Sequence, residues 1–174
     1  GVVTQPDKPR GRGLRMRYSP TKEIAMENGI ATFQPVSLRD PVLISRLRWF
    51  HADVFIVIAY GKFLPPEVLA LPKHFCINVH ASLLPKYRGA APVNWAILRG
   101  ESETGVTIMK MDAGMDTGDI IAQASCPIPD HITSAELRLT LADMGKELLS
   151  ETLPWIKAGT GPRAKPDEAL ATRA

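Results

Sequence analysis

Apolar residues recur in short runs that alternate with longer segments of helical spacing. The runs at residues 2–4, 31–34, 53–60 and 75–80 are bounded by Pro, Gly and polar residues, as β-strands are. The third run, DVFIVIAY, is almost continuously apolar and rich in branched side chains, and Gly61 ends it. This pattern predicts a central strand that is covered on both faces.

Segments of helical spacing lie between and after these runs. Residues 20–28 end in an Asn-Gly helix stop, residues 41–50 place apolar side chains on one face, and residues 91–98 open near a proline. The sequence TSAE at residues 133–136 is a capping-box pattern, and it predicts a long helix that runs to about Trp155.

The remaining segments complete one α/β domain. Residues 107–111 and 120–124 are predicted to form a pair of strands joined by the turn-rich sequence DAGMDTGD, and residues 6–19 a loop. Strands that alternate with helices predict an open, mostly parallel, Rossmann-like sheet with helices on both faces. We expect this domain to cover residues 1–158, and the Pro- and Gly-rich residues 159–174 to begin a linker.

Composition and cysteine usage are typical of a soluble cytoplasmic protein. The 174 residues are 45% hydrophobic, which is enough for one compact core. The sequence has no apolar run long enough to span a bilayer and no signal-peptide pattern. Cys76 and Cys126 lie in apolar, strand-like sequence without CxxC spacing, so we expect buried, reduced thiols.

The positive charge is concentrated near the start of the chain. The formal net charge is only +3, but the first two dozen residues contain a basic cluster opposed by only two acidic side chains: Lys8, Arg10, Arg12, Arg15, Arg17 and Lys22. Such a cluster is either a solvated loop or a binding surface for an anion.

Asn78 and His80 interrupt the predicted strand at residues 75–80. Side chains two apart on a strand point to the same face, so both would enter one pocket at the end of the strand. An amide and an imidazolium can together stabilise an oxyanion in acyl transfer, and a nearby carboxylate would stabilise the charged imidazole. The loop that follows offers three candidates for this carboxylate, Asp112, Asp116 and Asp119, and a purely structural role for either polar residue is the alternative.

Several other site classes lack support in the sequence. The chain has neither GxGxxG after a strand nor GxxxxGK[ST], which argues against nucleotide sites of those kinds. Its four histidines lack zinc spacing, DAGMDTGD does not match a calcium loop, and Ser82 has no GxSxG context. We therefore expect no metal and no serine nucleophile.

Two motifs resemble the folate-dependent formyltransferase family. These are NVHASLLPKYRGAAP at residues 78–92 and TGVTIMKMDAGMDTGDII at residues 104–121, and the similarity extends over essentially the whole chain. The RGAAP continuation and the basic QPDKPRGRG segment favour the tRNA-directed branch. The resemblance implies an enzyme that takes its formyl group from 10-formyltetrahydrofolate, a folate co-substrate, and transfers it to initiator methionyl-tRNA. It also implies a monomer.

The resemblance assigns roles to individual residues. It implies Asn78, His80 and Asp116 as the catalytic residues, with Asp112 and Asp119 shaping the loop. The folate contacts that it implies are Lys62, Phe63, Leu64, Ser82, Leu83, Leu84, Pro85, Ala113, Gly114 and Met115. The tRNA contacts that it implies are Arg10, Arg12, Arg15 and Arg17.

The sequence departs from the family pattern at both ends. The family has a further strand, turn and helix before TQPD, and a small β-barrel domain after DEALAT. Without the first strand, neighbouring strand edges would be exposed, so we expect this chain alone to be marginally stable or prone to aggregation. Alternative functions are formyl transfer to another amine, hydrolysis of the formyl donor, and a non-catalytic RNA-binding fragment.

Overall fold

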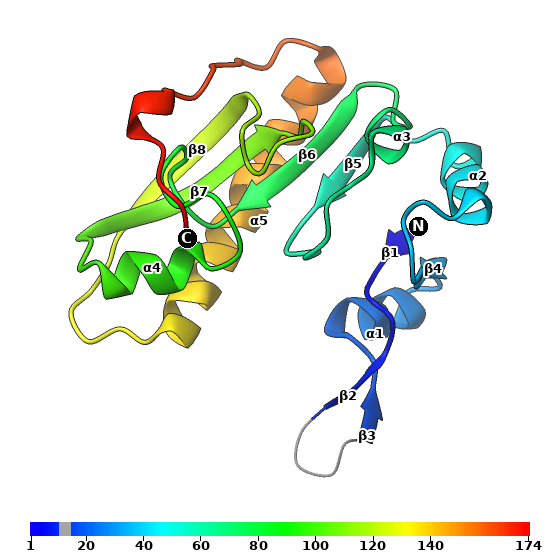
Figure 1. Cartoon of the computed structure of the whole chain (residues 1–174), viewed down its shortest axis with the longest axis horizontal. Coiled ribbons are helices and arrows are strands. Elements are labelled where there is room, and N and C mark those ends of the chain that lie inside the picture. Colours follow the sequence, from blue (N-terminus) through cyan, green and yellow to red (C-terminus); the bar gives the residue numbers. More distant parts are fainter. Residues whose placement is uncertain (11–14) are drawn as a thin grey trace.

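The computed structural model describes residues 1–10 and 15–174 (Figure 1). Its strands form three sheets. One parallel pair joins β1 (Val2–Val3) to β4 (Thr32–Phe33), and an antiparallel hairpin joins β2 (Lys8–Arg10) to β3 (Arg15–Arg17). The main sheet contains, in spatial order, β5 (Val54–Val57), β6 (Phe75–His80), β7 (Glu103–Lys110) and β8 (Ile120–Pro127).

Four helices begin where the sequence predicts, and they are α1 (Pro20–Glu27), α2 (Pro41–Trp49), α4 (Pro92–Leu98) and α5 (Ser134–Ala158). Two short ones, α3 (Pro66–Leu69) and the 3₁₀ helix η1 (Glu168–Leu170), were not predicted. Proline occupies the first helical position in α1 to α4, where its missing N–H costs nothing. The predicted capping box of α5 is confirmed, because Thr133 and Glu136 bond to each other's backbone N–H groups. Gly159 ends α5 in the left-handed conformation with a φ of 69°.

The α/β fold class is confirmed, and the main sheet is mixed in direction. Strand β5 is parallel to β6, whereas β6–β7 and β7–β8 are antiparallel. Strands β7 and β8 are joined directly by the loop at residues 111–119 without a crossover helix, and such a connection requires antiparallel strands.

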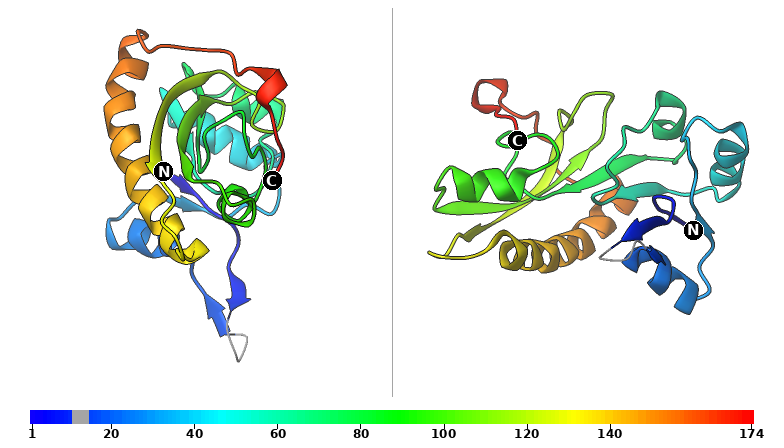
Figure 2. Two further views of the ribbon diagram at one scale, coloured as in Figure 1. Left: turned by 90° about the vertical axis from the view of Figure 1, so that its left-hand side faces the viewer. Right: turned by 60° about the horizontal axis from the view of Figure 1, so that its bottom comes forward.

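The main core lies between the sheet and α5. Ile77, Val106 and Ile108 pack against Leu137 and Leu141, and all five are buried. Figure 2 (left) shows α5 along one side of the sheet and the end of the chain on the other side. Burial of these side chains fixes the sheet on which the candidate site is built, since a fully buried aliphatic side chain contributes about 1.5–3 kcal/mol.

The prediction for β5 was partly wrong. The strand covers Val54–Val57 rather than the whole run at residues 53–60. Ile56 is 43% exposed and Ile58 is 59% exposed, so the segment is not covered on both faces. Within the described part of the chain, β5 pairs with β6 along one edge and has no strand on the other. The apolar run therefore predicted more burial than the structure shows for Ile56 and Ile58.

The predicted loop at residues 6–19 contains the β2–β3 hairpin, which the sequence analysis missed. Both strands are only three residues long and rich in Arg and Lys, so their sequence is too short and too polar to indicate a strand. Lys22 on α1 holds the base of the hairpin, because its Nζ donates to Asp7 Oδ2 at 2.6 Å and to Gln34 Oε1 at 2.7 Å. The hairpin extends away from the rest of the molecule (Figure 1).

Residues 159–174 fold back over the domain. Ile120 and Ala164 exchange two backbone hydrogen bonds of 2.8 and 2.9 Å, and Arg88 pairs with Arg173 in a parallel bridge. Whether this segment also begins a linker stays a prediction. Among residues 1–10 and 15–174, no helix has both the length and the apolar character needed to cross a membrane.

Candidate active site

Asn78 and His80 meet Asp116 beside the end of β6. The Asn78 Nδ2 amide donates to Asp116 Oδ1 over 3.2 Å, and His80 Nδ1 lies 3.6 Å from Asp116 Oδ2. Strand alternation places the first two side chains on one face, and the loop after β7 brings the third across to them. The structure therefore brings these three side chains together.

The fold of the 111–119 loop distinguishes the three aspartates. Asp112 Oδ1 accepts hydrogen bonds from Gly114 N at 2.8 Å and Thr117 Oγ1 at 2.7 Å, so this carboxylate shapes the turn. Asp119 closes the turn through its backbone carbonyl, which accepts from Lys110 N at 2.8 Å. Asp116 has a φ of 54°, a conformation that Asp tolerates better than most residues, and its carboxylate is the one that faces β6.

The ring of His80 is held in one orientation. Its Nε2 lies 2.9 Å from the Tyr87 carbonyl, and because a carbonyl can only accept, Nε2 must carry a hydrogen. Nδ1 is then the ring atom that gains or loses a proton, and it faces Asp116. The side chain is only 6% exposed, so water has little access to this pair.

The loop at residues 82–89 supports both His80 and Asp116. Tyr87 supplies the carbonyl that holds the imidazole, and Gly89 N donates to Asp116 Oδ2 at 2.9 Å. The loop is anchored from below by Thr107, whose fully buried hydroxyl donates to the Ser82 carbonyl at 2.6 Å and accepts from Leu84 N at 3.0 Å. The sequence analysis missed Thr107 and Gly89, because a threonine in a strand and a glycine in a loop carry no specific signal.

Burial changes the titration of the Tyr87 side chain. Burial raises the pKa of the Tyr87 phenol to about 12, and its hydrogen bond to the Glu101 carboxylate acts in the same direction. The phenol donates to Glu101 Oε1 at 2.5 Å, and this bond is the main reason that the pKa of Glu101 is lowered. The residue that orients His80 through its backbone is thus also fixed through its side chain.

A cavity of about 600 Å³ opens beside the three converging side chains. Its lining includes the end of β5, the end of β6 and the 111–119 loop, with apolar side chains from Val57, Met109 and Met111. Volumes of roughly 300–1,000 Å³ and a mostly apolar lining with a few polar groups are typical of small-molecule sites.

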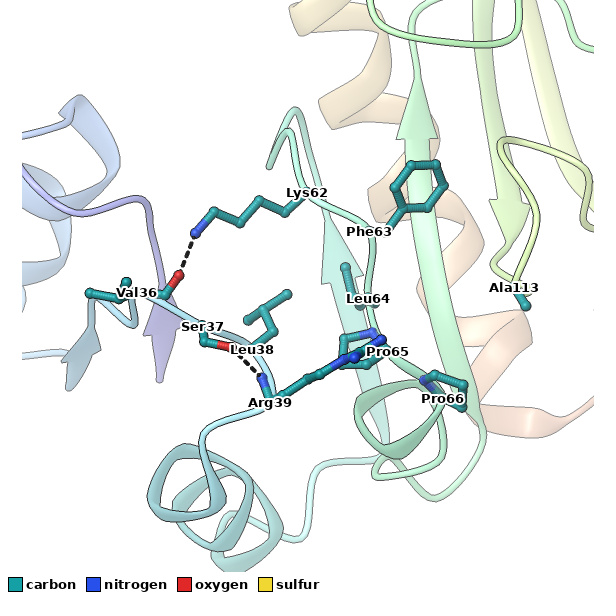
Figure 3. Close-up of a pocket in the computed structure, with 10 residues that line it drawn as sticks. All are labelled: Val36, Ser37, Leu38, Arg39, Lys62, Phe63, Leu64, Pro65, Pro66 and Ala113. Atoms are coloured by element: carbon teal, nitrogen blue, oxygen red, sulfur yellow. Dashed lines mark hydrogen bonds between the residues drawn. The ribbon is translucent and has the colours of Figure 1, made fainter.

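A second cavity of about 460 Å³ adjoins the first (Figure 3). Lys62 and Phe63 line both cavities, so the two share a wall. In Figure 3 the Lys62 side chain reaches across the opening and donates to the Val36 carbonyl over 2.9 Å. Arg39 adds a second cation to this cavity, which therefore suits an anionic group.

The residues expected to contact folate separate into two groups. Lys62, Phe63, Leu64, Ala113, Gly114 and Met115 each line one or both cavities. The four residues of the SLLP segment line neither: Ser82, Leu83, Leu84 and Pro85. Ser82 and Leu84 are buried, and the Ser82 hydroxyl donates to the Lys86 carbonyl at 2.6 Å, so these two support the loop from inside.

The arginines expected to contact tRNA belong to the β2–β3 hairpin. Arg17 is exposed on β3, and the backbones of Arg10 and Arg15 pair at the end of the two strands. Arg12 lies outside the described residues. Within the described part of the chain, no group of three or more His, Cys, Asp or Glu side chains could hold a metal ion.

Comparison with known proteins identifies the family. The model of the family described as formyl transferase matches residues 1–153. The chain is 52% identical over 163 residues to the methionyl-tRNA formyltransferase of Clostridioides difficile, covering 94% of this chain and 53% of that protein. It is 53% identical over 175 residues to the enzyme of the same name from Synechococcus sp. (strain JA-3-3Ab), covering 100% of this chain and 54% of that protein. The chain thus spans about half the length of these relatives.

Solved structures share the fold at lower identity. The formyltransferase PseJ from Anoxybacillus kamchatkensis, solved with a UDP-formamido sugar and tetrahydrofolate, superposes with a TM-score of 0.72 at 22% identity, covering 99% of this chain and 84% of that one. The phosphoribosylglycinamide formyltransferase from Streptococcus pneumoniae gives a TM-score of 0.73 at 23% identity, covering 81% and 82%. These likenesses establish the fold.

Proposed function

The chain belongs to the formyl transferase family, and on that premise we propose that it transfers the formyl group of 10-formyltetrahydrofolate to the α-amino group of methionyl-tRNA in translation initiation. The observation that carries the proposal is the convergence of Asn78, His80 and Asp116 beside a cavity of about 600 Å³. As an enzyme of translation initiation, it would act in the cytoplasm.

The two adjoining cavities fit the formyl donor. The larger one has the apolar walls and the few polar groups that a flat heterocycle needs, and the smaller one has Arg39 and Lys62 for a carboxylate tail. Lys62, Phe63 and Leu64 on one side, and Ala113, Gly114 and Met115 on the other, would hold it. When bound, this co-substrate supplies the electrophilic formyl carbon.

The side chains at the end of β6 would stabilise the charge that forms during transfer. As the amine nitrogen attacks the formyl carbon, negative charge develops on the formyl oxygen, and Asn78 Nδ2 and protonated His80 Nδ1 are the donors that can meet it. Both donors already lie close to the Asp116 carboxylate, so they are positioned before any substrate binds.

Asp116 would take part in the proton transfers of the reaction. A new carbon–nitrogen bond forms to the attacking amine, the bond from the formyl carbon to the folate nitrogen breaks, and one proton must leave the amine while another reaches the departing nitrogen. The Asp116 carboxylate faces His80 Nδ1 over 3.6 Å, so the pair can accept the first proton and return the second.

The β2–β3 hairpin is the surface that we assign to tRNA. Its two strands, which carry Lys8 and Arg17, extend away from the domain on a base fixed by Asp7, Lys22 and Gln34 (Figure 1). Contacts from such side chains to phosphates contribute affinity that falls with salt and carries no base recognition.

Acceptor dependence tests the proposal. Conversion of 10-formyltetrahydrofolate to tetrahydrofolate, which every transfer or hydrolysis reaction releases, is measured with methionyl-tRNA, with an amino sugar nucleotide, with glycinamide ribonucleotide, and with no acceptor. We expect product with methionyl-tRNA alone, and loss of product in Asp116→Asn. Turnover that is equally fast without an acceptor would identify a hydrolase instead. Retention of tRNA on a filter without any binding of a folate analogue would identify an RNA-binding fragment, and either result would overturn the proposal.

A further inference from the structure

The end of the chain binds the loop that orients the catalytic side chains. Residues 167–174, which we call the strap, run beside residues 85–89 and are hydrogen-bonded to them at several points. Thr172 N donates to the Pro85 carbonyl at 3.2 Å, and Ala174 N donates to the Arg88 carbonyl at 2.8 Å. More than 80 residues of sequence separate these partners, so the contact is formed by the tertiary fold.

The polar groups of the loop backbone are divided between the strap and the active site. Tyr87 N donates to Thr172 Oγ1 at 2.8 Å, and Arg88 N donates to the Thr172 carbonyl at 2.9 Å. The Tyr87 carbonyl instead accepts from His80, and Gly89 N donates to Asp116. Tyr87 therefore bonds both to the strap and to His80, and of the two residues that follow it Arg88 bonds to the strap and Gly89 to Asp116.

An ion pair reinforces the contact. The Arg88 guanidinium donates to both Glu168 oxygens, at 2.8 and 2.7 Å, and its side chain is only 10% exposed. Asp167 caps η1 through a 3.0 Å bond from Ala169 N, which fixes the turn that presents Glu168. A bidentate pair of this kind sets direction as well as distance.

The loop conformation needs external support. Tyr87 has a φ of 59° and Gly89 a φ of 117°, both in the left-handed half of the map. A tyrosine in this region is at a cost of order 1–3 kcal/mol and persists where surrounding contacts hold it. Here those contacts are the bonds to Thr172 and the Tyr87 bond to Glu101.

We propose that the strap positions His80 and Asp116 through residues 87–89, with Glu168 and Thr172 as positioning residues for the reaction. Neither residue lines the cavities, so both act through the loop. The catalytic part of this inference rests on the proposed function, and the geometric part does not.

Paired substitutions in the protein that carries this sequence test the strap. Thr172→Val removes the hydroxyl at nearly constant shape, Thr172→Ser keeps it, and Glu168→Gln removes the charge. The control is Glu147→Gln on the exposed face of α5. We expect Thr172→Val and Glu168→Gln to lower kcat by about ten-fold or more and to shift its pH profile, since small misplacements of catalytic groups cost up to about 100-fold. KM for the formyl donor should stay the same, and Thr172→Ser should restore kcat.

Ring signals of His80 in NMR spectra give a readout that does not depend on turnover. They should move in Thr172→Val and Glu168→Gln, and stay unchanged in Thr172→Ser and Glu147→Gln. The proposal for the strap would be overturned if Thr172→Val and Glu168→Gln left the His80 signals, the pH profile and kcat unchanged, even if the melting temperature fell. Absence of formyl transfer in the unaltered protein would contradict the proposed function instead, and the NMR comparison would still decide the role of the strap.

Discussion

Asn78 Nδ2 donates to Asp116 Oδ1 across 3.2 Å, although 38 residues separate the two in sequence. This bond holds the amide in place before substrate binds, and a carboxamide has a second N–H that can donate to a developing oxyanion. Asn78→Ala should therefore lower kcat by about 10²–10³-fold, or about 2.7–4 kcal/mol of transition-state stabilisation. Steady-state kinetics with methionyl-tRNA measure this loss, and Asn28→Ala at the exposed end of α1 is the matched control. Normal turnover in Asn78→Ala would remove the amide from the mechanism.

Asp116 can be neutralised without disturbing its backbone. Its φ of 54° suits Asn as well as Asp, so Asp116→Asn should keep the fold and lose about 10²–10⁴-fold in kcat by removing the proton acceptor. Asp116→Ala should in addition lower the free energy of unfolding by up to about 1–2 kcal/mol, since Ala lacks a side chain that supports this conformation. Kinetics of the two variants report the loss of the carboxylate charge, and urea unfolding reports the backbone strain. Equal unfolding curves for Asp116→Asn and Asp116→Ala would contradict the strain argument.

The buried hydroxyl of Thr107 should contribute to the stability of the fold. This hydroxyl accepts from Leu84 N and Gln123 Nε2 and donates to the Ser82 carbonyl. Thr107→Val leaves these partners unsatisfied in the interior, so the free energy of unfolding should fall by about 1–3 kcal/mol. Urea denaturation measures the difference. Thr140→Val on the exposed face of α5 is the control and should change stability little, so equal effects at both positions would contradict a special role for Thr107.

The sequence predicted those parts of the fold that have local causes. Proline and cap residues determined where α1, α2, α4 and α5 begin, and strand alternation placed Asn78 and His80 on one face. The sequence did not decide which of the three loop aspartates faces His80. That choice depends on which carboxylate turns inward within a tight loop.

The features that the sequence missed depend on contacts between distant segments. The antiparallel direction of β7 follows from pairing with β6, and the buried position of Ser82 follows from packing over Thr107. The strap is the clearest case, because it follows the Pro- and Gly-rich residues 159–166, which have the composition of a linker, and it is ordered here by bonds to residues 85–89. The basic hairpin was missed for a different reason, since its strands have only three residues each and are mostly Lys and Arg.

Tyr87 predicts how stability depends on alkaline pH. Burial and the bond to Glu101 raise the pKa of its phenol from 10.0 to about 12 in the folded protein. A raised pKa means that the folded state keeps the proton longer, so this contribution is complete below about pH 10 and is lost as pH rises through about 12. Tyr87→Phe should remove this loss. This is tested by measuring the free energy of unfolding of the unaltered chain and of Tyr87→Phe at pH 9 and at pH 11.5. The difference between these two free energies should shrink as pH rises.

Cys76 provides the background for that comparison. Burial also raises the pKa of its thiol to about 12, so both proteins lose stability at high pH from this group. The comparison of Tyr87→Phe with the unaltered chain cancels this shared part. A constant difference across the pH range would show that Tyr87 does not titrate with unfolding.

The last prediction concerns the hairpin and salt. If Lys8 and Arg17 contact tRNA phosphates, each contributes through counterion release, and the slope of log K against log salt should flatten by about 0.7–0.9 for each contact removed. Lys8→Ala with Arg17→Ala should therefore weaken tRNA binding most at low salt and lower the slope by about 1.4–1.8. The control with the same change in net charge is Lys146→Ala with Lys157→Ala on α5. Filter binding at several salt concentrations measures both slopes. An equal change of slope in the two double variants would mean that only the net charge of the protein matters and that the hairpin does not contact tRNA phosphates specifically. Long-range attraction depends on total charge, whereas phosphate contacts depend on position.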